Sequence, residues 1–138
     1  MKTNIATTQE QAARLLRCGV SADTADMCYD SGALSLMDYD SAVHERDSRR
    51  ETYEVVPAWS LSVLLSTILP CDISDNEIDY SLFLQRRRSA DNTPTWELSY
   101  YNLEYDATLL FVEVADPVEA AVQMAEKLTA NGYKLNEI

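Results

Sequence analysis

The chain has 138 residues, of which 46% are hydrophobic and 25% are charged. This length fits a single domain, residues 1–138, and the composition argues against a disordered chain. The net charge of -12 at pH 7 repels phosphate backbones and anionic lipid surfaces, so duplex nucleic acid is a disfavoured partner.

The hydropathy pattern predicts a cytoplasmic protein. The longest apolar stretch, Leu61 to Leu69, is interrupted by polar residues and is too short to cross a bilayer. The first residues lack the apolar core of a signal peptide. Cys18, Cys28 and Cys71 are odd in number and have no paired spacing, which predicts reduced thiols and argues against a disulfide framework or a zinc module.

Residues 7–29 are expected to form an N-terminal helical segment. Thr7 with Glu10, or Thr8 with Gln11, fits a reciprocal N-terminal cap, and Gly19 fits a left-handed C-terminal cap. A second short helix beginning after Ser21 would complete a helix-turn-helix pair. Its lack of basic side chains argues against DNA reading.

Residues 30–51 carry the weakest pattern and are expected to form a mobile loop. Residues 33–37 have the composition of a short strand, whereas residues 38–50 are polar and mixed in charge. Strand-like composition returns at residues 52–56, which begin an α/βββ/α core over residues 52–138.

A central helix is predicted between Pro57 and Pro70. Ser60 is expected to be its N-cap, with Trp59 and Leu64 in the two positions of a hydrophobic staple. Pro70 cannot continue the helical hydrogen bonds, so the helix should end near Leu69.

Three strands are predicted next, over residues 78–84, 95–101 and 107–114. Alternation gives each of the first two strands two distinct faces, and the third is apolar on both sides, as expected for a central or well covered strand. The short connections favour an antiparallel meander. In the first strand the residues that share a face are Ile78, Tyr80, Leu82 and Leu84, and in the second they are Trp96, Leu98 and Tyr100.

The last element is a helix that begins after Asp116 and runs to about Ala130. Asp116 is a suitable N-cap, Pro117 suits the first helical position, and Glu119 completes a capping box. The predicted fold class is α+β, with two layers. A three- to four-stranded, mostly antiparallel sheet packs against a central and a C-terminal helix, and short helices precede them.

The strands also suggest an interaction surface. Arg86, Arg87 and Arg88 follow the first strand, next to a sheet rich in aromatic residues. Such a surface could stack single-stranded nucleic acid, but the surrounding negative charge favours the simpler interpretation of a basic hairpin end that blunts a sheet edge. An exposed aromatic face would instead suit a protein partner, unless residues 30–51 cover it. The candidate residues are Tyr80, Arg86, Arg87, Arg88, Trp96, Tyr100 and Tyr101.

No pattern identifies a catalytic, cofactor-binding or metal site. A Cys28 and His44 pair would need a matched base and orienting group that the sequence does not indicate. Residues 72–77 offer oxygen ligands but lack the glycine of a calcium loop, so a solvated turn is expected there. The three glycines are too far apart for a phosphate-binding loop.

Several motifs together resemble a family of small uncharacterised proteins encoded in Bacteroides and related gut bacteria, often within prophage or other mobile-element regions. They are residues 25–27, 57–61, 64–65, 69–70 and 116–121, with Gly132-Tyr133. These motifs are helix boundaries and core positions, so the resemblance implies fold and genomic context and transfers no active site.

The sequence therefore favours a non-enzymatic, cytoplasmic interaction or accessory module of phage or mobile-element origin, without a cofactor. A protein partner is expected, and a basic one would complement the acidic surface. A small enzyme with an unrecognised site and a single-stranded nucleic-acid binder are the alternatives. The oligomeric state is left open.

Overall fold

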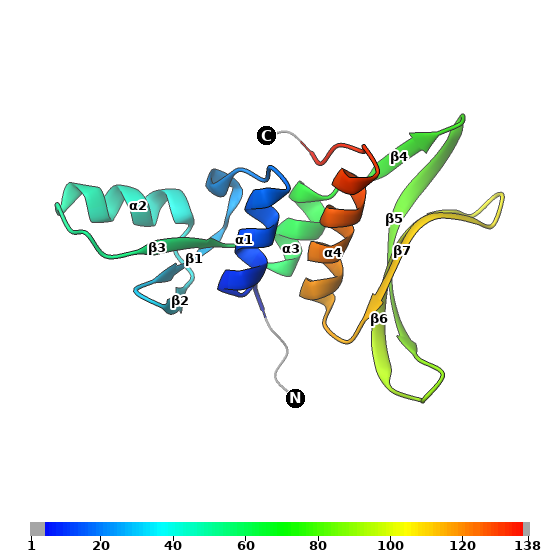
Figure 1. Ribbon diagram of the computed structural model, residues 1–138, viewed down its shortest axis with the longest axis horizontal. Coiled ribbons are helices and arrows are strands. Elements are labelled where there is room, and N and C mark those ends of the chain that lie inside the picture. Colours follow the sequence, from blue (N-terminus) through cyan, green and yellow to red (C-terminus); the bar gives the residue numbers. More distant parts are fainter. Residues whose placement is uncertain (1–4, 137–138) are drawn as a thin grey trace.

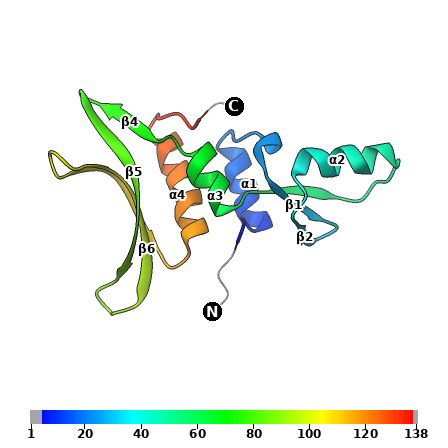
Figure 2. The same ribbon diagram turned by 180° about the vertical axis from the view of Figure 1, so that it is seen from behind.

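The computed structural model describes residues 5–136 and shows an α+β fold with two antiparallel sheets. Helices α1, α3 and α4 lie between a four-stranded main sheet and a three-stranded small sheet (Figures 1 and 2). The main sheet and its helices are the predicted two-layer unit, and the small sheet adds to it. The α+β prediction is confirmed.

The main sheet is an antiparallel meander in the order β4-β5-β6-β7. Its strands are β4 (Asp72–Asp75), β5 (Ile78–Arg88), β6 (Pro94–Asn102) and β7 (Ala107–Val114). Leu98 lies opposite Leu84 on one side and Val112 on the other, and this row faces the core. The predicted alternation is confirmed, since even-numbered residues of β5 and β6 form the inner face.

Strand β4 and the turn after it occupy residues 72–77, where a solvated turn was expected. Asp72–Asp75 pairs with the start of β5, and Asn76 and Glu77 form the tight connection. Both connecting residues have positive φ, 51° and 65°, as a type I′ turn requires. The alternation of exposed Asp72 and Ser74 with buried Ile73 is what a short edge strand needs.

Replacing Glu77 with glycine should stabilise the protein by about 0.5–1 kcal/mol. Glutamate has a Cβ that opposes the left-handed conformation, and the relief exceeds the entropy that glycine loses on folding. Urea unfolding measures the difference. Glu77→Ala is the matched control, because it removes the carboxylate but keeps the Cβ. An equal gain in both variants would show that charge, and not backbone strain, limits this turn.

Helix α4 (Pro117–Ala130) packs on the inner face of the main sheet. The predicted cap is confirmed: the Asp116 carboxylate accepts a hydrogen bond from the Glu119 backbone N–H at 3.1 Å. The Glu119 side chain does not close the capping box, because it extends to helix α1 instead. At the other end Gly132 has a φ of 82°, and the Tyr133 N–H bonds to the Leu128 carbonyl.

Helix α1 (Gln9–Arg17) uses the second of the two predicted caps. Thr8 and Gln11 exchange side-chain and backbone hydrogen bonds at its start. At its end Gly19 adopts a φ of 90°, and the Val20 N–H bonds to the Leu15 carbonyl. Both helix boundaries could be predicted because each cap lies within a few residues of sequence.

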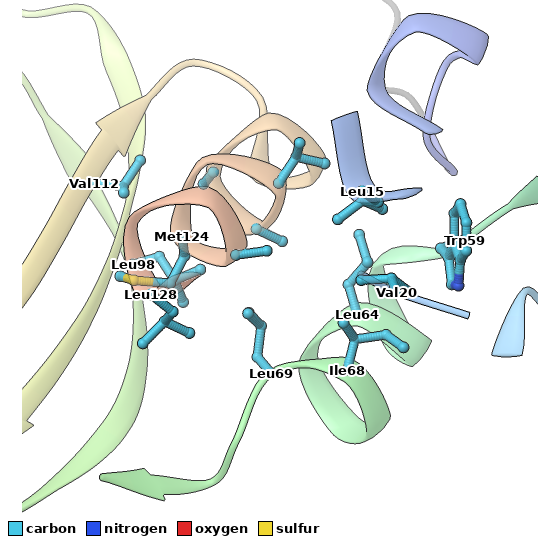
Figure 3. Packing of buried hydrophobic residues seen from close by; sticks show 14 of the residues in the cluster. Leu15, Val20, Trp59, Leu64, Ile68, Leu69, Leu98, Val112, Met124 and Leu128 are labelled. Atoms are coloured by element: carbon cyan, nitrogen blue, oxygen red, sulfur yellow. The ribbon is translucent and has the colours of Figure 1, made fainter. Parts of the chain in front are cut away.

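The central helix begins as α3 (Leu61–Val63) and continues as a π-helical turn, η2 (Leu64–Ile68). Ser60 is its N-cap, as predicted. The backbone N–H and the hydroxyl of Ser60 donate hydrogen bonds to the Asp26 carboxylate at 2.9 and 2.6 Å. Trp59 and Leu64 are both fully buried. Figure 3 shows Leu64 in one cluster with side chains of α1, α4 and the main sheet.

The secondary structure of residues 21–58 differs most from the sequence prediction. The segment after Ser21 forms a single 3-10 turn, η1 (Ala22–Thr24), so no helix-turn-helix forms. The chain then builds the small sheet, in the order β2-β1-β3. Its strands are β1 (Met27–Asp30), β2 (Ala33–Ser35) and β3 (Val55–Ala58). Pro57 is tolerated because β3 is an edge strand.

Helix α2 (Tyr39–Ser48) lies where a mobile loop was expected over residues 30–51. The Asp38 carboxylate caps it by accepting from the Ser41 N–H at 2.8 Å. Ala42 and its neighbours pack on Cys28 and Val55 of the small sheet. The helix lacks an apolar stripe of its own, which is why its sequence pattern did not indicate it.

Candidate interaction surface

Helices pack against only one of the two faces of the main sheet. The inner face packs against α4, while all helices lie on that one side of the sheet (Figures 1 and 2). Odd-numbered residues of β5 and β6 point to the opposite, outer face. No described element covers this outer face, because the helices lie on the other side of the sheet and α2 and β2 make their main contacts with η1, β1 and β3. Residues 30–51 therefore leave it open.

An aromatic cluster lies at the middle of the outer face. Phe83 and Phe111 lie on either side of Ser99, and they keep 47% and 43% of their surface exposed. Ser99 itself is buried between them. The Tyr101 ring centroid is 6.2 Å from that of Phe83. We call Phe83, Ser99, Tyr101 and Phe111 the outer aromatic patch.

Tyr101 is held in place by a hydrogen bond from its hydroxyl to the Asp106 carboxylate. This bond raises the pKa of Tyr101, because the carboxylate accepts from the neutral hydroxyl and favours that form. The two residues lie at opposite ends of the β6–β7 hairpin loop. The patch is thus fixed by the sheet and by its own turn.

The seven residues predicted as one surface divide between the two faces. Tyr80 and Tyr100 are buried on the inner face, and the Tyr100 hydroxyl donates to the Pro70 carbonyl at 2.7 Å. Burial raises the pKa of Tyr100. Neither residue contributes to a surface. Trp96 is half-buried on the inner face, and the guanidinium carbon of Arg86 lies over its ring, 5.3 Å from the ring centroid.

The remaining predicted residues lie at the β5–β6 hairpin end and on the outer face. Arg87 forms an ion pair with Glu97 at 2.5 Å on the outer face, and Tyr101 belongs to the outer aromatic patch. Arg88 is exposed at the hairpin end, where its Nη1 donates to the Asn92 carbonyl. The arginines and tyrosines do not form the continuous stacking platform that a single-stranded nucleic acid would need.

Phe83 and Phe111 were absent from the predicted surface. The signal for Phe83 was present, because it is out of phase with the inner-face residues on either side of it. For Phe111 there was none, since β7 is apolar on both sides. The register with Ser99 is what places the two residues on either side of the same position of β6.

Acidic residues surround the outer aromatic patch. Strand register places Asp72, Asp79 and Glu113 on the outer face, and all three are exposed. The only basic residue on this face of the strands, Arg87, is already paired with Glu97. The outer face is therefore apolar at its centre and negative at its rim.

The candidate nucleophile Cys28 is fully buried against Ala42 and Val55. Burial raises the pKa of its thiol, which opposes formation of a reactive thiolate. Among residues 5–136, no three metal-ligating side chains converge. This environment favours a packing role for Cys28.

A pocket of about 550 Å³ lies where the C-terminal ends of α1 and α4 meet. Its lining includes Cys18, Thr24, Thr129, Tyr133 and Lys134, and His44 is not among the lining residues. The pocket thus contains a thiol and an amine but no imidazole. Within the described chain, no hydrogen bond joins a nucleophile and a base in this pocket.

Comparison with protein-family models, with curated proteins and with solved structures finds no match. Within residues 5–136, no helix has both the length and the apolar character that crossing a membrane requires. Function therefore has to be argued from the surface of the molecule.

Proposed function

We propose that the chain is a non-enzymatic protein-interaction module that binds its partner through the outer aromatic patch. The observation that carries this proposal is the pairing of Phe83 and Phe111 across a buried Ser99 on a sheet face that no described element covers. Single exposed apolar residues are ordinary, but adjacent aromatic rings form a patch of the kind used in protein interfaces.

The rigidity of the patch supports binding. Its residues lie on the two central strands and on β7, which are backed by α4 on the other face. Aromatic anchors on regular strands lose little conformational entropy when a partner binds. Tyr101 adds a polar handle that Asp106 already orients.

The acidic rim favours a partner with basic residues around an apolar centre. Asp72, Asp79 and Glu113 lie around the patch without a cationic partner within the described chain. Charge complementarity of this kind raises association rates and rejects acidic partners. A cytoplasmic setting and a phage or mobile-element origin remain predictions from the sequence.

Substituting both aromatic anchors, Phe83→Ser with Phe111→Ser, should lower recovery of a partner from native lysate by about tenfold or more, as expected for interface hot spots. Leu36→Ser with Leu103→Ser is the matched control, because these residues are 81% and 85% exposed outside the patch. Quantitative mass spectrometry of proteins retained by each variant gives the comparison.

A photo-crosslinking phenylalanine analogue at position 111 provides the second measurement. It should attach to the same partner that the patch variant loses, whereas the analogue at position 36 should not. If every retained protein is recovered equally by the patch variant and its control, the patch is not the binding surface.

A further inference from the structure

Strand β5 has an open edge. It spans 11 residues, but β4 spans only four and pairs with Ile78 to Ser81. The last bond on that side runs from the Leu82 N–H to the Cys71 carbonyl at 2.9 Å. Beyond it, residues Phe83 to Arg88 pair only with β6. We call residues 83–88 the open β5 edge.

The direction of the Leu82 bond shows which backbone groups point toward this edge. In an antiparallel strand, N–H and C=O groups of alternate residues point to the same side. Leu84, Arg86 and Arg88 therefore present three N–H and three C=O groups to the open edge. Pro94 fits this assignment, because it lies opposite Arg88 and has no N–H to donate.

The side chains along this edge are basic. Arg86 and Arg88 lie on the same face of β5 and are two residues apart, and neither forms an ion pair within residues 5–136. Arg87 points to the other face and is neutralised by Glu97. The three arginines and Pro94 line a shallow hollow of about 280 Å³.

We propose that the open β5 edge binds an extended segment of a partner protein as an added strand, with carboxylates at alternate positions facing Arg86 and Arg88. Main-chain hydrogen bonds would give such a segment its register, and the two unpaired guanidinium groups would select acidic side chains. The edge shares only Phe83 with the outer aromatic patch, and the backbone groups that would bind the segment belong to Leu84, Arg86 and Arg88, so the inference does not depend on binding at that patch.

A second copy of this chain fits the edge less well. Pairing two β5 edges antiparallel brings the two sets of arginines together, and like charges across strands are destabilising. At the other long edge, β7, one backbone carbonyl already has a hydrogen-bond partner, because the Lys127 Nζ donates to the Phe111 carbonyl at 2.6 Å. An acidic segment of another protein is therefore the occupant that the charges favour.

The probe is a labelled peptide of about seven residues that alternates glutamate with valine, and the first measurement is fluorescence anisotropy with the full chain. We expect a dissociation constant of about 10–100 µM, typical of a short added strand without further contacts. A peptide with lysine in place of glutamate should not bind. Equal binding of both peptides would overturn the charge assignment.

Two variants separate the role of Arg86 and Arg88 from that of Arg87. Arg86→Gln with Arg88→Gln should weaken peptide binding by about tenfold or more, whereas Arg87→Gln should change it less than about threefold, because its charge is already paired. All three substitutions leave the backbone donors in place. A larger loss in Arg87→Gln than in the double variant would contradict the proposal.

Amide hydrogen exchange tests the added strand itself. The N–H groups of Leu84, Arg86 and Arg88 should exchange rapidly in the free protein and become protected by the peptide. Those of Phe83, Gln85 and Arg87 should be protected in both states, because they point to β6. Peptide binding without this alternation would overturn strand addition, as would displacement of the peptide by a second copy of the chain or tighter binding of a single-stranded oligonucleotide.

Discussion

Replacing Trp59 with alanine should lower the free energy of unfolding by about 3–5 kcal/mol, the cost typical of removing a buried tryptophan. Trp59 is fully buried in the main core, and its indole N–H donates to the Thr24 hydroxyl at 2.8 Å. It joins the entrance of the central helix to η1. Since domains of this size are stable by only about 5–15 kcal/mol, the variant should be near the limit of folding at 37 °C.

Trp59→Phe separates packing from the hydrogen bond. It keeps most of the apolar surface but removes the donor to Thr24, so we expect a loss of about 1–2 kcal/mol. Leu103→Ala, at an 85% exposed site, should change stability by less than about 0.5 kcal/mol. Guanidinium unfolding followed by circular dichroism measures all three. A small effect of Trp59→Ala would mean that the helix entrance is held by other contacts.

The second large effect is expected at Arg14, which joins α1 to α4. Its guanidinium bonds to both Glu119 oxygens at 2.8 and 3.0 Å and to Glu126 at 2.5 Å, and it is only 20% exposed. Arg14→Met would leave two carboxylates together at a partly buried helix interface. We expect a loss of about 1–3 kcal/mol at pH 7, less than for a fully buried pair because water reaches Glu126.

The pH dependence should identify this mechanism. Burial by itself would raise the pKa of Glu119, but hydrogen bonds from Arg14, Gln11 and Gln123 outweigh it and hold the pKa below its ordinary value. A lowered pKa contributes stability above the unfolded-state pKa, and this contribution is lost as the pH falls through the folded-state pKa. The native protein should therefore lose stability as the pH falls below about 4.

In Arg14→Met, the contribution of Glu119 to stability should depend on pH in the opposite direction. Without the guanidinium, burial acts against only the hydrogen bonds from Gln11 and Gln123, and because burial is the largest influence on Glu119 we expect its pKa to rise. Part of the lost stability should then return as the pH is lowered from 7 toward about 4.5. Arg17→Met is the matched control, since Arg17 is an exposed arginine of the same helix. Parallel pH profiles for the native protein and Arg14→Met would contradict a role for this charge cluster.

Elements with local signals could be predicted from the sequence. The caps of α1, the central helix and α4 each lie within a few residues, and the alternation of β5 and β6 repeats over a full strand. Residues 21–51 could not be predicted in the same way, because β1 and β2 are only three or four residues long and their hairpin becomes a sheet only when β1 pairs with β3. Short strands of this kind depend on partners that lie far away in the sequence.

The candidate site could be predicted only in part. Alternation indicates which residues share a face, but it does not tell which face the helices cover. Tyr80 and Tyr100 were predicted as surface residues, but they lie buried in the main core. The contacts of Arg14 lie 105 and 112 residues away, so no local pattern indicates them.

The two long edges of the main sheet are unequal, and this sets a limit on assembly. The β5 edge is open, whereas Lys127 occupies a carbonyl of the β7 edge. A filament built by continuing this sheet from copy to copy needs an open edge on both sides. Because one carbonyl of the β7 edge is already bonded to Lys127, we expect this edge to add a strand less readily than the β5 edge, so the sheet should accept a partner more readily than it continues from copy to copy.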